Sequence, residues 1–113
     1  LDELSAQHRD ANTVAVLENG AIAQVTATVT AEIHPDIKGG SAAENAEEMR
    51  ALLNGGGRSG HRDAVIVNAA GALVVAGRAA NVPEARPLAE QSLAGGAART
   101  ALERLIDVTR SAP

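Results

Sequence analysis

A chain of 113 residues is long enough for one small domain with one modest hydrophobic core. Its net charge of −4, from 14 acidic and 10 basic residues scattered along the chain, disfavours nucleic-acid binding. The absence of cysteine excludes disulfides and thiolate sites and fits a reducing compartment, so we expect a cytoplasmic protein. No apolar run reaches the roughly 18 residues of a membrane span.

Aromatic residues are missing altogether, since Phe, Tyr and Trp each number 0. The core must therefore be built from Ala, Val, Leu and Ile, which bury less area per residue than aromatic side chains do. A small domain of this kind is marginal unless it packs against something more. We expect residues 1–113 to form a single segment that depends on a partner or on a larger domain.

The chain opens on LDELSAQHRD, with two adjacent carboxylates, Asp2 and Glu3. Mg²⁺ prefers oxygen ligands and is typically held by one or two carboxylates together with substrate phosphates. Taken alone, however, an acidic pair near a chain end is typical of solvated charge. The choice between the two interpretations depends on the rest of the sequence.

Two segments rich in β-branched residues, at 13–18 and 21–30, flank Asn19-Gly20, the dipeptide that best accepts the positive φ angles of a type I′ turn. This turn predicts a hairpin in which Leu17 pairs with Ile22. The same register pairs Val16 with Ala23 and Val14 with Val25. Because an isolated hairpin is marginal in water, we expect it to join a larger sheet or to lie against helices.

A capping box, Ser41-Ala-Ala-Glu44, predicts a helix that begins there and ends at Asn54 and the glycines after it. Its expected buried stripe comprises Ala42, Ala46, Met49, Leu52 and Leu53. The glycines before the cap, in Lys38-Gly39-Gly40, are the best candidate for an anion-binding loop. Helix punctuation is the simpler interpretation, because no phosphate-loop motif is present.

Residues 62–76, RDAVIVNAAGALVVA, are apolar almost all round and predict a central helix buried on most sides, although their valines also suit a buried strand. Gly71 in its interior suggests close packing against another backbone. Asn68 is a buried amide that needs partners. We expect His61 to lie near the start of the helix as a structural residue, with Asp63 in the first turn facing the helix dipole.

Two further helices complete the prediction. Asn81 is the expected cap of the first, although Pro87 should kink it or postpone its start. The second covers 97–112, with an expected buried side of Ala98, Ala101, Leu102, Leu105 and Val108 or Thr109. The predicted fold class is thus mixed α/β, a β-hairpin followed by about four helices.

In order and spacing, these features resemble the C-terminal part of the α/β domain of anthranilate phosphoribosyltransferases, a domain of the phosphoribosyltransferase and nucleoside-phosphorylase type. The residues that carry the resemblance are Leu1-Asp2-Glu3, the hairpin about Asn19-Gly20, Gly39-Gly40 with Glu44-Asn45-Ala46, Arg62 to Val65 with Asn68-Ala69-Ala70, and Ala94 to Ala97.

The resemblance implies a glycosyltransferase that moves the phosphoribosyl group of phosphoribosyl pyrophosphate to anthranilate, in tryptophan biosynthesis. In the family, the Asp-Glu of the Leu-Asp-Glu motif holds a Mg²⁺ ion, so Asp2 and Glu3 inherit a metal-ligand role. No residue of this chain inherits a catalytic role, and Asn68 looks like scaffold. A carboxylate-held cation is also what a departing pyrophosphate needs, because it stabilises the developing negative charge.

The chain departs from the family in what it lacks. The family's Gly-Thr-Gly-Gly-Asp phosphate loop, its Lys-His-Gly-Asn-Arg stretch and the arginine that contacts anthranilate have no counterpart, and the segment before Gly39 is shorter than usual, with only His34-Pro35-Asp36 in place of a longer run. We therefore expect a C-terminal portion that is inactive alone. Two alternatives stay open: a protein of related fold that binds a nucleobase or nucleic acid, and a non-catalytic helical interaction module.

Overall fold

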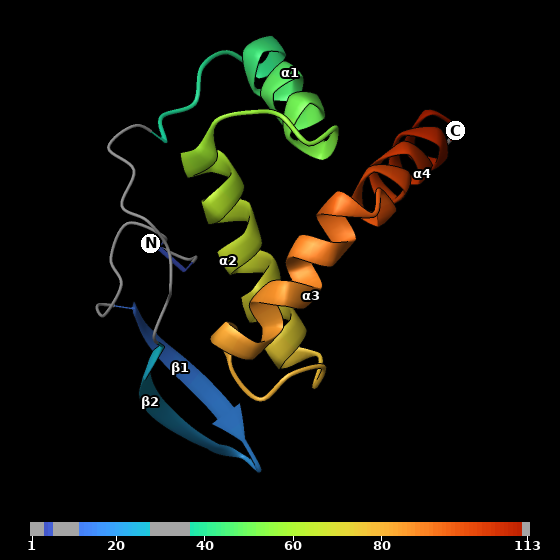
Figure 1. The fold of residues 1–113 in the computed structure, drawn as a ribbon. Helices are drawn as coiled ribbons and strands as arrows, with labels where there is room; N and C mark the ends of the chain where they lie inside the picture. The colour runs from blue at the N-terminus through green and yellow to red at the C-terminus, as the bar shows by residue number, and fades with distance from the viewer. Residues whose placement is uncertain (1–3, 6–11, 28–36, 112–113) are drawn as a thin grey trace.

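A computed structural model of the chain describes residues 4–5, 12–27 and 37–111. Two antiparallel strands precede four helices (Figure 1), which confirms the predicted mixed α/β class. The elements are β1 (Asn12–Glu18), β2 (Ala21–Ala27), α1 (Ala42–Leu53), α2 (Ser59–Val75), α3 (Val82–Ala94) and α4 (Ala97–Ser111). Helices α2 and α3 pack against each other at the centre, and the hairpin lies at one edge of the molecule.

The hairpin has the predicted register, with Leu17 opposite Ile22, Val16 opposite Ala23 and Val14 opposite Val25. Asn19 and Gly20 adopt φ angles of 50° and 80°, as a type I′ turn requires. The expected larger sheet is not found in the described part of the chain, where the sheet has two strands. Leu17 and Ile22 accordingly remain 71% and 75% exposed.

Helix α1 has the predicted boundaries because side chains satisfy its first backbone donors. The Ser41 hydroxyl accepts from the Glu44 backbone N–H, and the Glu44 carboxylate accepts from the Ser41 backbone N–H at 2.7 Å. The Ser41 hydroxyl also donates to the Glu44 carboxylate at 2.7 Å, and this hydrogen bond together with the one from the Ser41 backbone N–H lowers the pKa of Glu44. The expected buried stripe is only partly confirmed: Leu52 is buried and Ala46 and Leu53 are half-buried, whereas Ala42 and Met49 are exposed.

Residues 59–75 form a helix and not a strand, so the strand alternative for this segment was wrong. Helix α2 begins at Ser59, three residues before the expected position. It is also less buried than its composition indicated, because Val65 and Val75 are 47% and 91% exposed. Its buried residues are Gly60, Ile66, Val67 and Ala70.

Helix α3 begins where Asn81 caps it, since the Asn81 side chain accepts from the Glu84 backbone N–H at 2.9 Å. Pro87 lies inside the helix and does not postpone its start. Asp63 was expected to face the dipole of α2, but it lies beyond the first turn and instead pairs with Arg86 of α3 at 2.7 Å. Burial opposes the charge of Arg86, yet the hydrogen bonds to Asp63 and Glu90 raise its pKa.

The main core lies between α1, α2 and α3. Leu52, Ile66, Ala89 and Leu93 form one buried cluster. Helix α4 adds little to it. None of its residues is buried, and of the side predicted to be buried only Ala98 and Leu102 are even half-buried, while Leu105 and Val108 are 59% and 61% exposed. The stability of the folded chain therefore depends on a few aliphatic contacts of α2.

We predict that Ile66→Ala destabilises the chain by about 2–4 kcal/mol, because Ile66 is 2% exposed at the centre of this cluster. Urea unfolding followed by circular dichroism measures the change. Val65→Ala is the matched control: it removes an exposed aliphatic side chain from the neighbouring position and should cost less than about 0.5 kcal/mol. Equal losses in the two variants would contradict the packing described.

Candidate functional site

The two predicted metal ligands, Asp2 and Glu3, lie outside the described residues. What the structure describes is the segment immediately after them, Leu4 and Ser5, and the contacts that hold it. These contacts form the candidate site, because they hold the residue that directly follows Glu3 in the sequence.

Asn68 of α2 holds both backbone groups of Leu4. Its side-chain oxygen accepts from the Leu4 N–H at 2.8 Å, and its side-chain nitrogen donates to the Leu4 carbonyl at 2.9 Å. The same nitrogen donates to the carbonyl of Ala64, one turn back along the helix, at 3.0 Å. The side-chain amide of Asn68, which the sequence indicated needs partners, is thus hydrogen-bonded to the backbone of a residue 64 positions away.

Asn12 holds both backbone groups of Ser5 in the same way. Its side-chain oxygen accepts from the Ser5 N–H at 2.7 Å, and its nitrogen donates to the Ser5 carbonyl at 3.0 Å. Asn12 opens strand β1 and is 8% exposed. Two consecutive residues are therefore fixed through their backbones, one by a helix and the other by the hairpin.

The Leu4 side chain packs on the same face of α2. It packs against Val67, as Ala64 does, and a Cβ built at Gly71 would come within 2.8 Å of its Cδ1 atom. Gly71 was expected to allow close approach of a backbone, but the neighbour here is a side chain. Glycine at this position leaves the space that Leu4 occupies beside Asn68.

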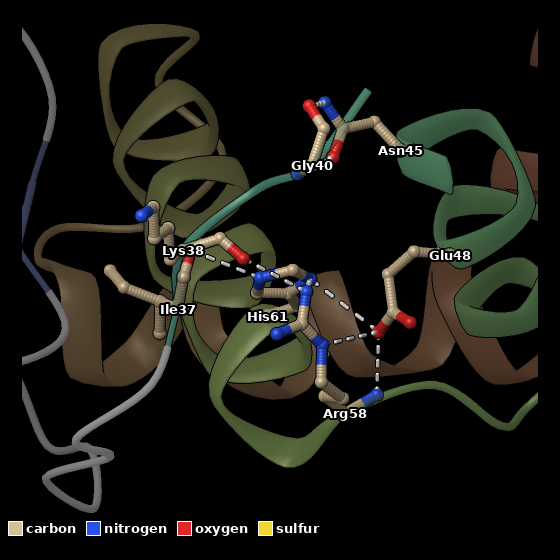
Figure 2. Close-up of polar contacts among 7 residues, drawn as sticks. All are labelled: Ile37, Lys38, Gly40, Asn45, Glu48, Arg58 and His61. Atoms are coloured by element: carbon tan, nitrogen blue, oxygen red, sulfur yellow. Dashed lines mark hydrogen bonds and ion pairs between the residues drawn. The ribbon is translucent and has the colours of Figure 1, made fainter. Parts of the chain in front are cut away.

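A second polar cluster joins the start of α2 to α1 (Figure 2). The Glu48 carboxylate accepts from the Arg58 backbone N–H at 2.7 Å and lies 3.6 Å from the Arg58 Nε and 3.4 Å from the His61 Nδ1. The hydrogen bond from the Arg58 backbone lowers the pKa of Glu48, and the positive charge of Arg58 acts in the same direction.

The His61 ring is occupied on both nitrogens. Nε2 lies 3.0 Å from the Ile37 carbonyl, and Nδ1 lies 3.2 Å from the Arg58 Nη2. A carbonyl can only accept and a guanidinium can only donate, so the neutral ring carries its hydrogen on Nε2. The expected structural role of His61 agrees with these contacts, which tie residues 37–38 to the start of α2 (Figure 2).

The two backbone amides directly before α1, those of Gly40 and Ser41, are already hydrogen-bonded within the chain. The Gly40 N–H donates to the Asn45 Oδ1 at 2.9 Å, and Asn45 donates back to the Gly40 carbonyl at 3.1 Å. The next amide, that of Ser41, is taken by Glu44. These contacts favour the interpretation of Lys38-Gly39-Gly40 as helix punctuation (Figure 2).

Over residues 4–5, 12–27 and 37–111, no group of three or more His, Cys, Asp and Glu side chains could hold a metal ion. In the same ranges, no helix has the length and apolar character needed to cross a membrane. The acidic pair predicted from the sequence stays the candidate metal site of the chain.

Comparison with known proteins decides the family. Residues 1–99 match the family described as "Glycosyl transferase family, a/b domain". The chain belongs to this glycosyl transferase family. Among curated proteins, the anthranilate phosphoribosyltransferase of Methylobacterium nodulans is 39% identical over 116 residues, which cover 98% of this chain and 34% of the relative.

Two further relatives of this glycosyl transferase chain carry the same name. The anthranilate phosphoribosyltransferase of Rhizobium meliloti is 45% identical over 76 residues, covering 67% of the chain and 22% of the relative. That of Myxococcus xanthus is 54% identical over 71 residues, covering 63% of the chain and 21% of the relative. The resemblance found in the sequence is confirmed, and the chain spans about a fifth to a third of the length of these relatives.

Sequence reasoning recognised that Asn68 needs partners but took it as general scaffold, and it did not single out Asn12. The pairing with Leu4 could not be predicted, because nothing local in the sequence relates positions 4 and 68. A polar amide in an otherwise apolar helix was the available signal.

We predict that Asn68→Asp destabilises the chain by about 1–3 kcal/mol, because it places a carboxylate oxygen beside the carbonyls of Leu4 and Ala64 where an N–H now donates. Chemical unfolding gives the global effect, and hydrogen exchange at the Leu4 amide gives the local one. Asn19→Asp, the same change at the exposed hairpin turn, is the control and should cost less than about 0.5 kcal/mol. Unaltered exchange at Leu4 would refute the clamp.

We predict that Glu48→Gln lowers the melting temperature at neutral pH and that its difference from the unsubstituted chain shrinks in acid. Because folding lowers the pKa of Glu48 from its usual 4.5, its stabilisation is fully present above that pH and is lost as the pH falls through the lowered value. Thermal melts across this range measure the difference. Glu47→Gln, at an exposed neighbour, should show little pH-dependent difference, and a constant difference for Glu48→Gln would contradict the assignment.

Proposed function

We propose that this chain takes part in the transfer of a phosphoribosyl group from phosphoribosyl pyrophosphate to anthranilate, a step of tryptophan biosynthesis in the cytoplasm. The proposal is supported by the family match over residues 1–99 and by relatives named anthranilate phosphoribosyltransferase. The order of motifs from Leu1-Asp2-Glu3 to Ala94 supports it further, because it covers nearly the whole chain.

Asp2 and Glu3 would hold a Mg²⁺ ion in this reaction. Two adjacent carboxylates supply the hard oxygen donors that Mg²⁺ prefers, and their chemistry fits the group. The bound cation would neutralise negative charge on the pyrophosphate as it departs. The clamp of Leu4, the residue next to Glu3, by Asn68 of α2 supports this proposal.

The residues of this chain would act by positioning. Asn68 and Asn12 fix the backbone of Leu4 and Ser5, the two residues that follow Glu3 in the sequence. A metal ligand that is already held in place loses less conformational entropy on binding the ion than an unsupported one does. Asn68 is thus a positioning residue for the acidic pair and has no role at the reacting atoms.

A chimera with a curated relative tests the proposed function directly. The matched third of the Methylobacterium nodulans relative is replaced by this chain, and formation of phosphoribosylanthranilate is followed with both substrates and Mg²⁺. We expect turnover, and we expect Asp2→Asn or Glu3→Gln within the chimera to lower kcat/KM by about a hundredfold, as loss of a group that stabilises the transition state does. The 113 residues alone should show no turnover.

The control for charge is Glu47→Gln in the same chimera, which removes an exposed carboxylate of α1 and should leave turnover unchanged. Circular dichroism and melting temperature establish that each chimera is folded. A folded chimera that binds phosphoribosyl pyrophosphate and forms no phosphoribosylanthranilate would refute the transferase function of this chain. Unchanged turnover in Asp2→Asn and Glu3→Gln would refute the metal assignment and leave the transferase function standing.

A further inference from the structure

A pocket of about 610 Å³ opens where four helix ends meet. Its wall includes the turn between α1 and α2 at Gly55, Gly56 and Gly57, and the turn between α3 and α4 at Gly95 and Gly96. The volume falls within the range of small-molecule sites. Because glycines form both turns, no side chain from them fills the pocket.

Arg62 reaches this pocket from the first turns of α2. With 3.6 residues per turn, Arg62 falls on the helix face of Ile66 and Leu73, whereas Asn68 and Gly71 fall on the opposite face. The pocket and Leu4 therefore lie on opposite sides of α2. In the part of the chain that the structure describes, the Arg62 guanidinium makes no hydrogen bond or ion pair, although the residue is half-buried.

Arg99 reaches the pocket from α4 and is held across it. Its Nη1 donates to the Asn54 side chain, at the end of α1, at 3.2 Å. A Cβ at Gly96 would lie 3.5 Å from its Nη2. The ion pair with Glu103 is long, at 3.9 Å, and both side chains are more than half exposed. Most of the five guanidinium donors are thus left for a ligand.

The remaining lining determines the kind of ligand. It includes Ser59, Leu53 and Leu93, and no Asp or Glu. Two arginines without an acidic neighbour in the wall are unusual in a chain of net charge −4, which would otherwise repel anions. Guanidinium groups bind phosphate through paired hydrogen bonds, and the leucines offer apolar contact to an organic group.

We propose that this pocket binds the phosphate monoester of a small organic molecule, with Arg62 and Arg99 on the phosphate and Leu53 and Leu93 beside the organic part. The proposal rests on the pocket alone and is independent of the proposed function.

Calorimetric titration of the chain with phenyl phosphate tests the proposal, and inorganic phosphate and phenol are titrated separately. Phenyl phosphate should bind saturably, more tightly than inorganic phosphate, and phenol should not bind. Arg62→Gln and Arg99→Gln should each weaken phenyl phosphate at least about tenfold, since each removes charged hydrogen bonds. Arg104→Gln, at an exposed position of α4, removes the same charge outside the pocket and should leave binding unchanged.

Amide NMR shifts locate the ligand, and the largest should fall at Gly55 to Gly57 and at Gly95 and Gly96. Arg62→Lys, which keeps the charge, should recover part of the affinity if the variants are folded. Absence of saturable binding at millimolar phenyl phosphate would overturn the proposal, as would equal weakening by all three glutamine variants. Inorganic phosphate binding as tightly as phenyl phosphate would overturn the assignment of the organic part.

Discussion

Helix α2 packs on two opposite faces, and the rest of the structure depends on this constraint. One face carries Ile66 into the cluster shared with α1 and α3, and the other carries Val67 and Asn68 against Leu4. A chain without aromatic residues has few ways to bury area, so one helix must serve both contacts. Small residues of α2 allow this close packing. Ala70 is 0% exposed, and Gly71 leaves space for the Leu4 side chain.

Amide side chains provide the hydrogen bonds that aliphatic packing cannot provide. Leu4 and Ser5 have no regular secondary structure, so their backbone groups need partners from elsewhere. Asn68 and Asn12 supply a donor and an acceptor each, which satisfies both groups of each residue. Such a clamp recognises backbone, not side chains. It therefore fixes the place of the segment next to the acidic pair through its backbone, and the packing of Leu4 on Val67 adds to it.

Local features of the fold could be predicted from the sequence, and distant ones could not. The turn at Asn19 and the caps at Ser41 and Asn81 depend on neighbouring residues, and each is confirmed. The exposure of Leu105 could not be predicted, because a helical period says which side of α4 would be buried and not whether a partner covers it. The Asn68 clamp and the pocket at Arg62 join residues far apart in the sequence, which single-sequence patterns do not relate.

The polar contacts of α2 fix its rotation more than they add to its stability. Exposed ion pairs contribute little free energy, and the contacts of Glu48 with Arg58 and His61 lie near the surface. With the Asp63 pair to Arg86, however, they hold the first turns of α2 against both α1 and α3. A helix advances about 100° per residue, so a rotation by one position would turn Asn68 away from Leu4 and Arg62 away from the pocket together. The orientation of one helix thus decides both sites.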